Sequence, residues 1–139
     1  MSEFIPNPAP RPMNLLDQQF WDYCADGMLC FQCCVDCETW RHMPRFMCAN
    51  CGSEKWGWRE SNGRGTVYTW TVCHMPMTKE FEKVFPYAVL IVEMEEGVRI
   101  TAGLRDMDYR DLAVGLPVEV VMEPLEKGGK LPFFRPVQE

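Results

Sequence analysis

Two Cys-x-x-Cys pairs constrain this chain more than any other feature of its sequence. Cys34 and Cys37 form the first pair, Cys48 and Cys51 form the second, and ten residues separate the two pairs. Each pair can present two thiolates to one ion, and the residues between them can form a hairpin that brings the pairs together. This spacing predicts a tetrahedral Zn²⁺ site with these four cysteines as ligands. Another metal centre, such as an iron–sulfur cluster, and disulfides are the alternatives.

Four thiolates leave no open coordination position, so the predicted zinc site is structural rather than hydrolytic. Bound metal would stabilise a segment too short to form a core of its own. Cys33 could compete with its neighbour through the spacing Cys33-x₃-Cys37, but Cys34 gives two identical pairs and is the preferred ligand. His42 is an alternative ligand that the four thiolates make unnecessary.

The composition is that of a folded protein. Of the 139 residues, 47% are hydrophobic and 24% are charged, which fits one domain or two very small units. No apolar run approaches the ~18 residues of a membrane-spanning helix, and the amino terminus lacks the basic and apolar regions of a secretory signal. We therefore expect a cytoplasmic protein that contacts no membrane, and stable disulfides are rare in that compartment.

The charge distribution argues against nucleic acid as a partner. Residues 1–58 contain four Lys or Arg against seven Asp or Glu, and residues 59–139 contain ten against thirteen, so each part carries −3 of the net −6. Proteins that bind a phosphate backbone usually present a basic stripe, because release of counterions supplies much of the binding free energy. The sequence contains no such stripe.

The chain divides into an arm, a helix, a cysteine segment and a β-rich region. Four prolines make residues 1–12 an extended arm that cannot be helical. From Met13 to about Gly27, Leu16, Phe20 and Cys24 recur at helical spacing and predict a short amphipathic helix that docks either on this chain's own core or on a partner. The predicted units are an arm and helix over 1–29, a zinc ribbon over 30–56 and a barrel over 57–139.

Five strands are expected in the last eighty residues, with no convincing helix among them. The segments are TVYTWTVCHM (66–75), YAVLIVEME (87–95), VRITAGLR (98–105), PVEVVMEPL (117–125) and LPFFRPV (131–137). They are rich in β-branched and aromatic residues and are separated by turn signals. Because YAVLIV is apolar on both faces, it fits a strand covered on both sides. The pattern predicts a mainly β chain that ends in a small closed barrel.

No motif in the sequence indicates an active site. Cys73 and His74 are neighbours on a predicted strand, where adjacent side chains point to opposite faces. The chain contains no nucleophile elbow, glycine-rich phosphate loop or HExxH motif. We therefore expect no catalytic residues on this chain.

Several separate segments resemble one known family, in the same order along the chain. They are FWDYCADGMLCFQCCVDC (20–37), MPRFMCANCGS (43–53), GRGTVYTWTV (63–72), FPYAVLIVEMEEGVRI (85–100), VGLPVEVVME (114–123) and LPFFRPV (131–137). Together they resemble the zinc-ribbon and OB-fold proteins long catalogued as a domain of unknown function and as acyl-CoA-associated. One departure is that Glu38 follows the second cysteine, where the family usually has Gly.

The resemblance implies an amino-terminal helix, a rubredoxin-like zinc ribbon and a carboxy-terminal OB-fold barrel. It also implies an accessory role beside a thiolase-fold enzyme, as in the small subunit of benzoylsuccinyl-CoA thiolase or the partners of steroid side-chain aldolases. In such assemblies the partner carries the catalytic cysteine and histidine, and the zinc-ribbon protein helps to form the acyl-CoA channel. A heterotetramer of two large and two small subunits is the expected assembly.

Candidate contact residues follow from this implied role. Large or adaptable side chains around the helix and ribbon are candidates for the partner interface, namely Phe20, Trp21, Trp40, Met43 and Phe46. Cations that could contact the phosphates of CoA are Arg41, Arg45, Arg64, Lys79 and Lys83. The alternative is an OB-fold that binds single-stranded nucleic acid by stacking bases on Trp58, Tyr68 and Trp70.

Overall fold

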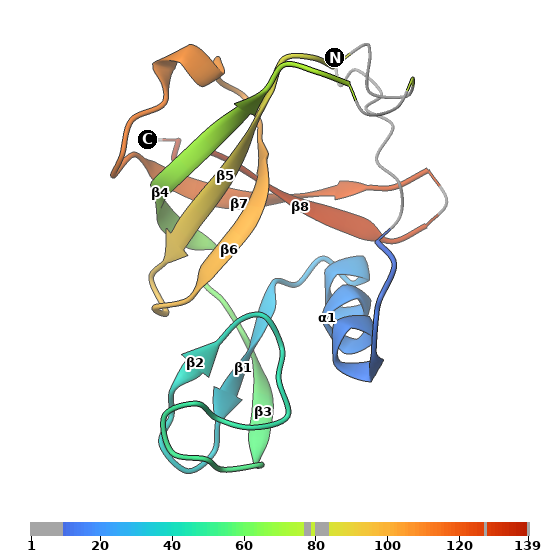
Figure 1. Cartoon of the computed structure of the whole chain (residues 1–139), viewed down its shortest axis with the longest axis vertical. Coiled ribbons are helices and arrows are strands. Elements are labelled where there is room, and N and C mark those ends of the chain that lie inside the picture. Colours follow the sequence, from blue (N-terminus) through green and yellow to red (C-terminus); the bar gives the residue numbers. More distant parts are fainter. Residues whose placement is uncertain (1–9, 77–78, 80–83, 127, 139) are drawn as a thin grey trace.

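The structure is a computed structural model that describes residues 10–76, 79, 84–126 and 128–138. One helix, α1 (Leu15–Ala25), precedes two β units (Figure 1). The strands are β1 (Cys30–Cys34), β2 (Trp40–Arg41), β3 (Trp56–Glu60), β4 (Arg64–Cys73), β5 (Tyr87–Met94), β6 (Arg99–Leu104), β7 (Pro117–Pro124) and β8 (Lys130–Pro136), with a 3₁₀ helix, η2 (Tyr109–Asp111), before β7. The prediction of a mainly β chain with one short helix is confirmed.

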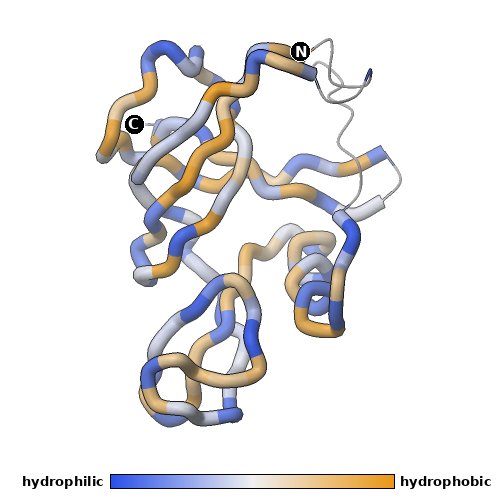
Figure 2. The backbone as a smooth tube through the Cα atoms, in the orientation of Figure 1, coloured by the Kyte–Doolittle hydropathy of each residue, from blue (hydrophilic) through white to orange (hydrophobic). Residues whose placement is uncertain are grey.

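The last five strands form a closed barrel in the order β4-β5-β6-β8-β7, as expected for an OB-fold. All neighbouring pairs are antiparallel except β6 and β8, which are parallel. Along β5, Ala88, Leu90, Val92 and Met94 are buried inside the barrel and alternate with half-buried or exposed residues. Figure 2 shows the apolar stretches that run through the barrel strands. The expectation that YAVLIV is covered on both faces is therefore met fully only on the inner face.

Two glycines are required where the chain enters the barrel. Gly63 has a φ of +78°, a conformation that residues with a Cβ rarely adopt. Gly65 lies so close to β5 that a Cβ there would meet the backbone oxygen of Glu93 at 2.5 Å. The Gly-x-Gly sequence thus permits both the turn into β4 and the close pairing of β4 with β5.

Helix α1 packs against β8 of the barrel and β1 of the smaller sheet, so it joins the two β units. Its buried face consists of Leu16, Phe20 and Cys24, as the helical spacing predicts. The side chain of Asn14 caps the amino terminus of the helix by accepting from the backbone N–H of Asp17 at 3.0 Å. The helix therefore docks on its own chain. No helix among the described residues has the length and apolar character needed to span a membrane.

The cysteine segment forms a three-stranded antiparallel sheet in the order β2-β1-β3. Strand β3 pairs with all five residues of β1, from Cys34 opposite Trp56 to Cys30 opposite Glu60. This pairing carries the ribbon sheet as far as Glu60. The division into 1–29, 30–56 and 57–139 stays a prediction.

Candidate metal centre and adjoining groove

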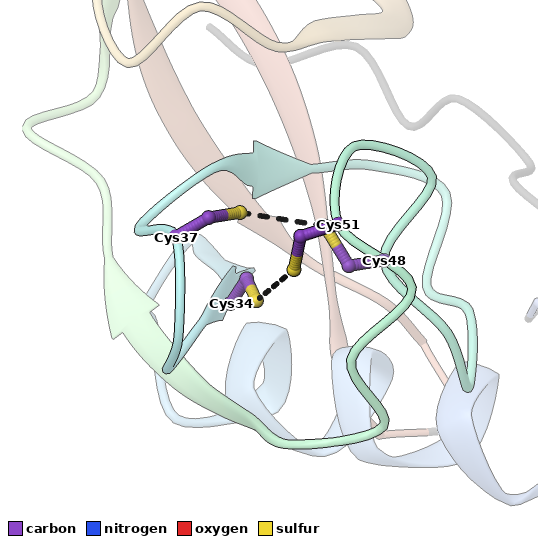
Figure 3. A group of neighbouring side chains, drawn as sticks. All are labelled: Cys34, Cys37, Cys48 and Cys51. Atoms are coloured by element: carbon purple, nitrogen blue, oxygen red, sulfur yellow. Dashed lines mark hydrogen bonds between the residues drawn. The ribbon is translucent and has the colours of Figure 1, made fainter.

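Four thiols, two from each of two turns of the ribbon, lie close together (Figure 3). The Sγ atoms of Cys34, Cys37, Cys48 and Cys51 all lie within 4.8 Å of one another. The Sγ atoms of Cys34 and Cys51 are 3.6 Å apart, and those of Cys37 and Cys48 are also 3.6 Å apart. Tetrahedral Zn–S bonds of about 2.3 Å place sulfur atoms about 3.8 Å apart. The donor set and its spacing therefore fit one metal ion.

The two cysteine turns have nearly the same backbone geometry. The N–H of Glu38 donates to the carbonyl of Cys34 at 3.0 Å, and the N–H of Gly52 donates to the carbonyl of Cys48 at 2.8 Å. Both residues have the left-handed backbone conformation, with φ of +61° at Glu38 and +77° at Gly52. Glycine adopts this conformation freely, whereas a residue with a Cβ does so at a cost. The first turn therefore keeps the geometry of the second but carries backbone strain at Glu38.

Hydrogen bonds around the thiols favour thiolates at some positions. The Thr39 hydroxyl lies 3.2 Å from Cys37 Sγ, and Asn50 Nδ2 donates to that sulfur at 3.5 Å. These contacts lower the pKa of Cys37 to about 5. At Cys51 the backbone N–H of Ser53 lowers the pKa, but hydrogen bonding to the other thiols and loss of hydration raise it to about 12. Four thiolates this close repel one another, and a bound cation would remove that repulsion.

The remaining cysteines of the segment lie outside the four-thiol cluster. Cys33 is buried, and its Sγ lies 3.5 Å from the carbonyl oxygen of Glu38. Cys24 and Cys30 are also buried, and burial raises the pKa of these thiols to about 12 and about 11. All three thiols therefore stay protonated at neutral pH and pack as small apolar groups. The geometry thus selects Cys34, not Cys33, as the first ligand.

A buried glutamine fixes the loop that leads to the second cysteine pair. Gln32 is fully buried, and its Oε1 accepts from Arg41 Nε at 2.8 Å and from the backbone N–H of Arg45 at 2.8 Å. Arg41 Nη2 in turn donates to the carbonyl of Arg45 at 2.7 Å. The guanidinium of Arg41 also lies 5.6 Å from the ring centroid of Trp56. Arg41, a predicted CoA contact, thus holds the carbonyl of Arg45 within the ribbon, while Gln32 holds the N–H of Arg45.

A groove of about 450 Å³ lies between this loop and the start of α1. It is lined by Asn14, Leu16, Pro44, Arg45, Phe46, Met47, Cys48 and Ala49. Two of the lining residues, Phe46 and Met47, are exposed large apolar side chains, and Met13, Leu15 and Met43, which are neighbours in sequence of lining residues, are exposed as well. We call this site the helix–ribbon groove. Because Cys48 lines it, the groove and the metal centre share a wall.

The predicted partner contacts fall into three groups. Phe20 is only 5% exposed and packs in the core, where a partner cannot reach it without movement of α1. Trp21 and Trp40 are half-buried and pack against the same core. Met43 and Phe46 are exposed beside the groove. The partner-contact role of these exposed and half-buried residues stays a prediction.

The remaining predicted CoA contacts lie in different segments of the chain. Arg45 lines the groove, whereas Arg64 begins β4 and Lys79 lies between β4 and β5, both exposed. Lys83 lies outside the described residues. Sequence reasoning missed the exposed Met13, Leu15 and Met47 and the anchoring role of Gln32. The available signal was that Gln32 is the polar residue within the apolar stretch CFQCC, which indicates a buried polar side chain with specific partners.

His42 is a packing residue and not a metal ligand. Its ring lies 4.9 Å from that of Phe20 on α1 and 5.1 Å from that of Phe31 on β1. Burial lowers the pKa of His42 from 6.5 to about 4, and the nearby Asp17 carboxylate opposes that shift in part. Its Nδ1 is buried without a hydrogen-bond partner. The neutral imidazole thus fills the contact between helix and ribbon.

Comparison with known proteins assigns the chain to a family. Residues 58–123 match the family described as "ChsH2, C-terminal OB-fold domain". A DUF35 domain-containing scaffold protein of Methanocaldococcus jannaschii is 36% identical over 77% of this chain and 73% of its own length. The chain belongs to the DUF35 family. This confirms the resemblance found in the sequence.

Two further relatives of this DUF35 protein carry more specific names. A probable enoyl-CoA hydratase alpha subunit of Thermomonospora curvata is 38% identical over 91% of this chain, which spans only 40% of that relative's length. A chain of the solved structure described as "Ltp2-ChsH2(DUF35) aldolase" is 34% identical, with a TM-score of 0.83 over 91% of this chain and 98% of that chain. The DUF35 fold described above is thus shared over nearly the whole chain.

The first prediction concerns the ligand set of this DUF35 protein. Replacing Cys48 with Ser should lower the metal content of the purified protein from about one ion per chain to near zero, because a buried ligand is lost. Cys33→Ser, the matched control, should keep about one ion. Elemental analysis by mass spectrometry measures both. Full metal content in Cys48→Ser together with loss in Cys33→Ser would contradict the assignment.

The second prediction concerns the strained cysteine turn. Glu38→Gly should stabilise the protein by about 1 kcal/mol, because glycine relieves the left-handed strain at this position. Gly52→Ala, its counterpart in the second turn, should destabilise by a similar amount. Urea unfolding followed by circular dichroism measures the two changes. If both substitutions changed the free energy of unfolding in the same direction, the left-handed backbone would not be the cause of strain at Glu38.

The third prediction concerns His42 and pH. The folded-state pKa of about 4 lies below the ordinary 6.5, so the unfolded chain binds the proton more readily. The contribution of the neutral, buried His42 to the free energy of unfolding is therefore complete above pH 6.5. It is lost as the pH falls toward 4, which lowers the free energy of unfolding by roughly 2–3 kcal/mol. His42→Phe should remove this part of the pH dependence, and the exposed control His74→Ala should not. Urea unfolding of the three proteins between pH 4 and 7 tests it, and parallel curves for wild type and His42→Phe would contradict it.

Proposed function

We propose that this protein is a non-catalytic accessory subunit of a thiolase-fold acyl-CoA enzyme that makes or breaks carbon–carbon bonds. Activities of this class include benzoylsuccinyl-CoA thiolase and the steroid side-chain aldolases. The observation that carries the proposal is the match to 98% of the DUF35 chain in the Ltp2–ChsH2 aldolase. That structure's name pairs a DUF35 chain with a second protein, Ltp2, in one aldolase. The hydratase alpha-subunit name of another relative also associates the fold with acyl-CoA chemistry.

The site itself supports an accessory role. Within the described part of the chain, the cluster of metal-binding groups consists of four cysteines. Zn²⁺ is the proposed ion, because four thiolates at tetrahedral spacing suit it and leave no position open for substrate. The resident metal would therefore stabilise the ribbon and take no part in the reaction. The exposed apolar side chains around the helix–ribbon groove are the kind of surface that subunits bury.

The finer features of the proposal concern the assembly. The partner would supply the catalytic cysteine and histidine, and two copies of each subunit would form a heterotetramer. Arg41, Arg45, Arg64, Lys79 and Lys83 remain candidates for contacts with the phosphates of CoA. A reducing cytoplasm is the proposed location, because free thiols persist there.

The fourth prediction tests the partner directly. The tagged protein, recovered from an extract of its native cells, should retain a thiolase-fold protein at close to a 1:1 ratio, identified and quantified by mass spectrometry. The retained pair should remain together in 0.5 M salt, because apolar contacts resist screening. An untagged extract is the control. Recovery of the protein alone would refute the proposal. Recovery with nucleic acid that salt removes would also refute it and would favour a nucleic-acid-binding OB-fold.

A further inference from the structure

The helix–ribbon groove combines an apolar surface with positive charge. Met13 is 91% exposed, Leu15 is 66% exposed and Phe46 is 59% exposed, with Met43 and Met47 beside them. These residues come from only two segments, 13–15 and 43–47, and the groove lies between those segments. Exposed apolar groups that gather around one hollow mark a binding site more often than scattered ones do.

This surface is held in place although it faces solvent. The buried Gln32 and the half-buried Arg41 each make one hydrogen bond to the backbone of Arg45, at 2.8 and 2.7 Å, and Arg41 Nε donates to Gln32 Oε1 at 2.8 Å. The ring of Phe46 packs edge-on against Trp56, with centroids 6.0 Å apart. Loop 43–47 therefore presents its apolar side chains in one shape, and a partner need not order the loop on binding.

The charge of the groove identifies the chemistry of its occupant. Arg45 lines the groove and Arg41 lies behind it, and within the described part of the chain neither has a carboxylate within 4.0 Å. Arg41 Nη1 is buried without an acceptor. The amino terminus of α1 adds partial positive charge, but the Asp17 carboxylate there, which accepts from the N–H of Met13 at 3.1 Å, offsets it. Arg45 is therefore the charge that lines the groove, and it favours an acidic group on the occupant.

We propose that the helix–ribbon groove binds a segment of the partner subunit in which apolar side chains lie next to Asp or Glu. The apolar side chains fill the groove beside Met47 and Leu16, and the carboxylate pairs with Arg45. The inference rests on the proposed function, because it requires a partner subunit. It also makes Gln32 and Arg41 positioning residues for the interface.

The fifth prediction uses oxidation of methionine to locate the interface. In the free protein, peroxide should oxidise Met13, Met43 and Met47, which are exposed, and also Met75, which is exposed just after β4. In the complex retained by the pull-down, the first three should be oxidised about tenfold more slowly and Met75 at its free rate. Mass spectrometry of the digested protein gives the four rates. Retention of the partner without this protection would overturn the groove assignment and leave the accessory role intact.

Charge is tested by zero-length cross-linking of the same complex. Arg45→Lys places an amine at the rim, and a carbodiimide should join it to an Asp or Glu of the partner that lies beside apolar residues. Arg110→Lys is the matched control, because Arg110 pairs with Asp108 of its own chain at 2.6 Å, so its cross-link should be internal. A new cross-link to no partner carboxylate, or to one flanked only by polar residues, would overturn the proposal.

Two further measurements distinguish a partner segment in the groove from CoA bound there. Arg45→Glu and Phe46→Ser should each weaken partner binding by about tenfold or more, whereas Val114→Ser, an exposed apolar control on the barrel, should leave it unchanged. CoA added to the free protein should not protect Met13, Met43 or Met47. Protection by CoA alone would assign the groove to the nucleotide and overturn the proposal.

Discussion

The convergence of four thiols is the constraint on which the ribbon depends. Between β1 and β3 lie 21 residues, and the two residues of β2 are the regular structure among them. Strand pairing alone fixes little of this segment, and ordering each residue costs about 1–2 kcal/mol of conformational entropy. A structural metal can supply on the order of 10 kcal/mol to such a segment. A metal ion held by the four thiols would therefore take the place of the hydrophobic core that the ribbon is too small to form.

The same constraint reaches the surface through Cys48. This residue is a buried member of the thiol cluster, and it also lines the helix–ribbon groove. The loop that precedes it is fixed at Arg45 by Gln32 and Arg41. A change at the thiol cluster would thus be expected to alter the shape of the loop and of the exposed apolar surface, because Cys48 belongs to both sites. The accessory role proposed above would use this arrangement to present a stable shape to a partner.

Features with a fixed spacing could be predicted from the sequence. The cysteine pairs, the buried face of α1 and the five barrel strands are all periodic or local signals, and the structure has them where they were expected. The pairing of β3 with β1 could not be predicted in this way, because it depends on which distant segments of the chain meet in the folded sheet. Gln32 was missed for the same reason: its partners lie 9 and 13 residues farther along the chain.

The buried polar groups of the ribbon argue that its shape matters as well as its stability. Gln32 Nε2 and Arg41 Nη1 are both buried without acceptors, and an unpaired buried donor costs about 1–3 kcal/mol. Apolar residues of similar volume would avoid this cost, as replacement of buried ionic groups often does. They could not, however, hold the N–H and the carbonyl of Arg45 at the same time. The cost of two unpaired donors is consistent with a loop whose conformation is needed at the surface, where Met43, Phe46 and Met47 are exposed and Arg45 lines the groove.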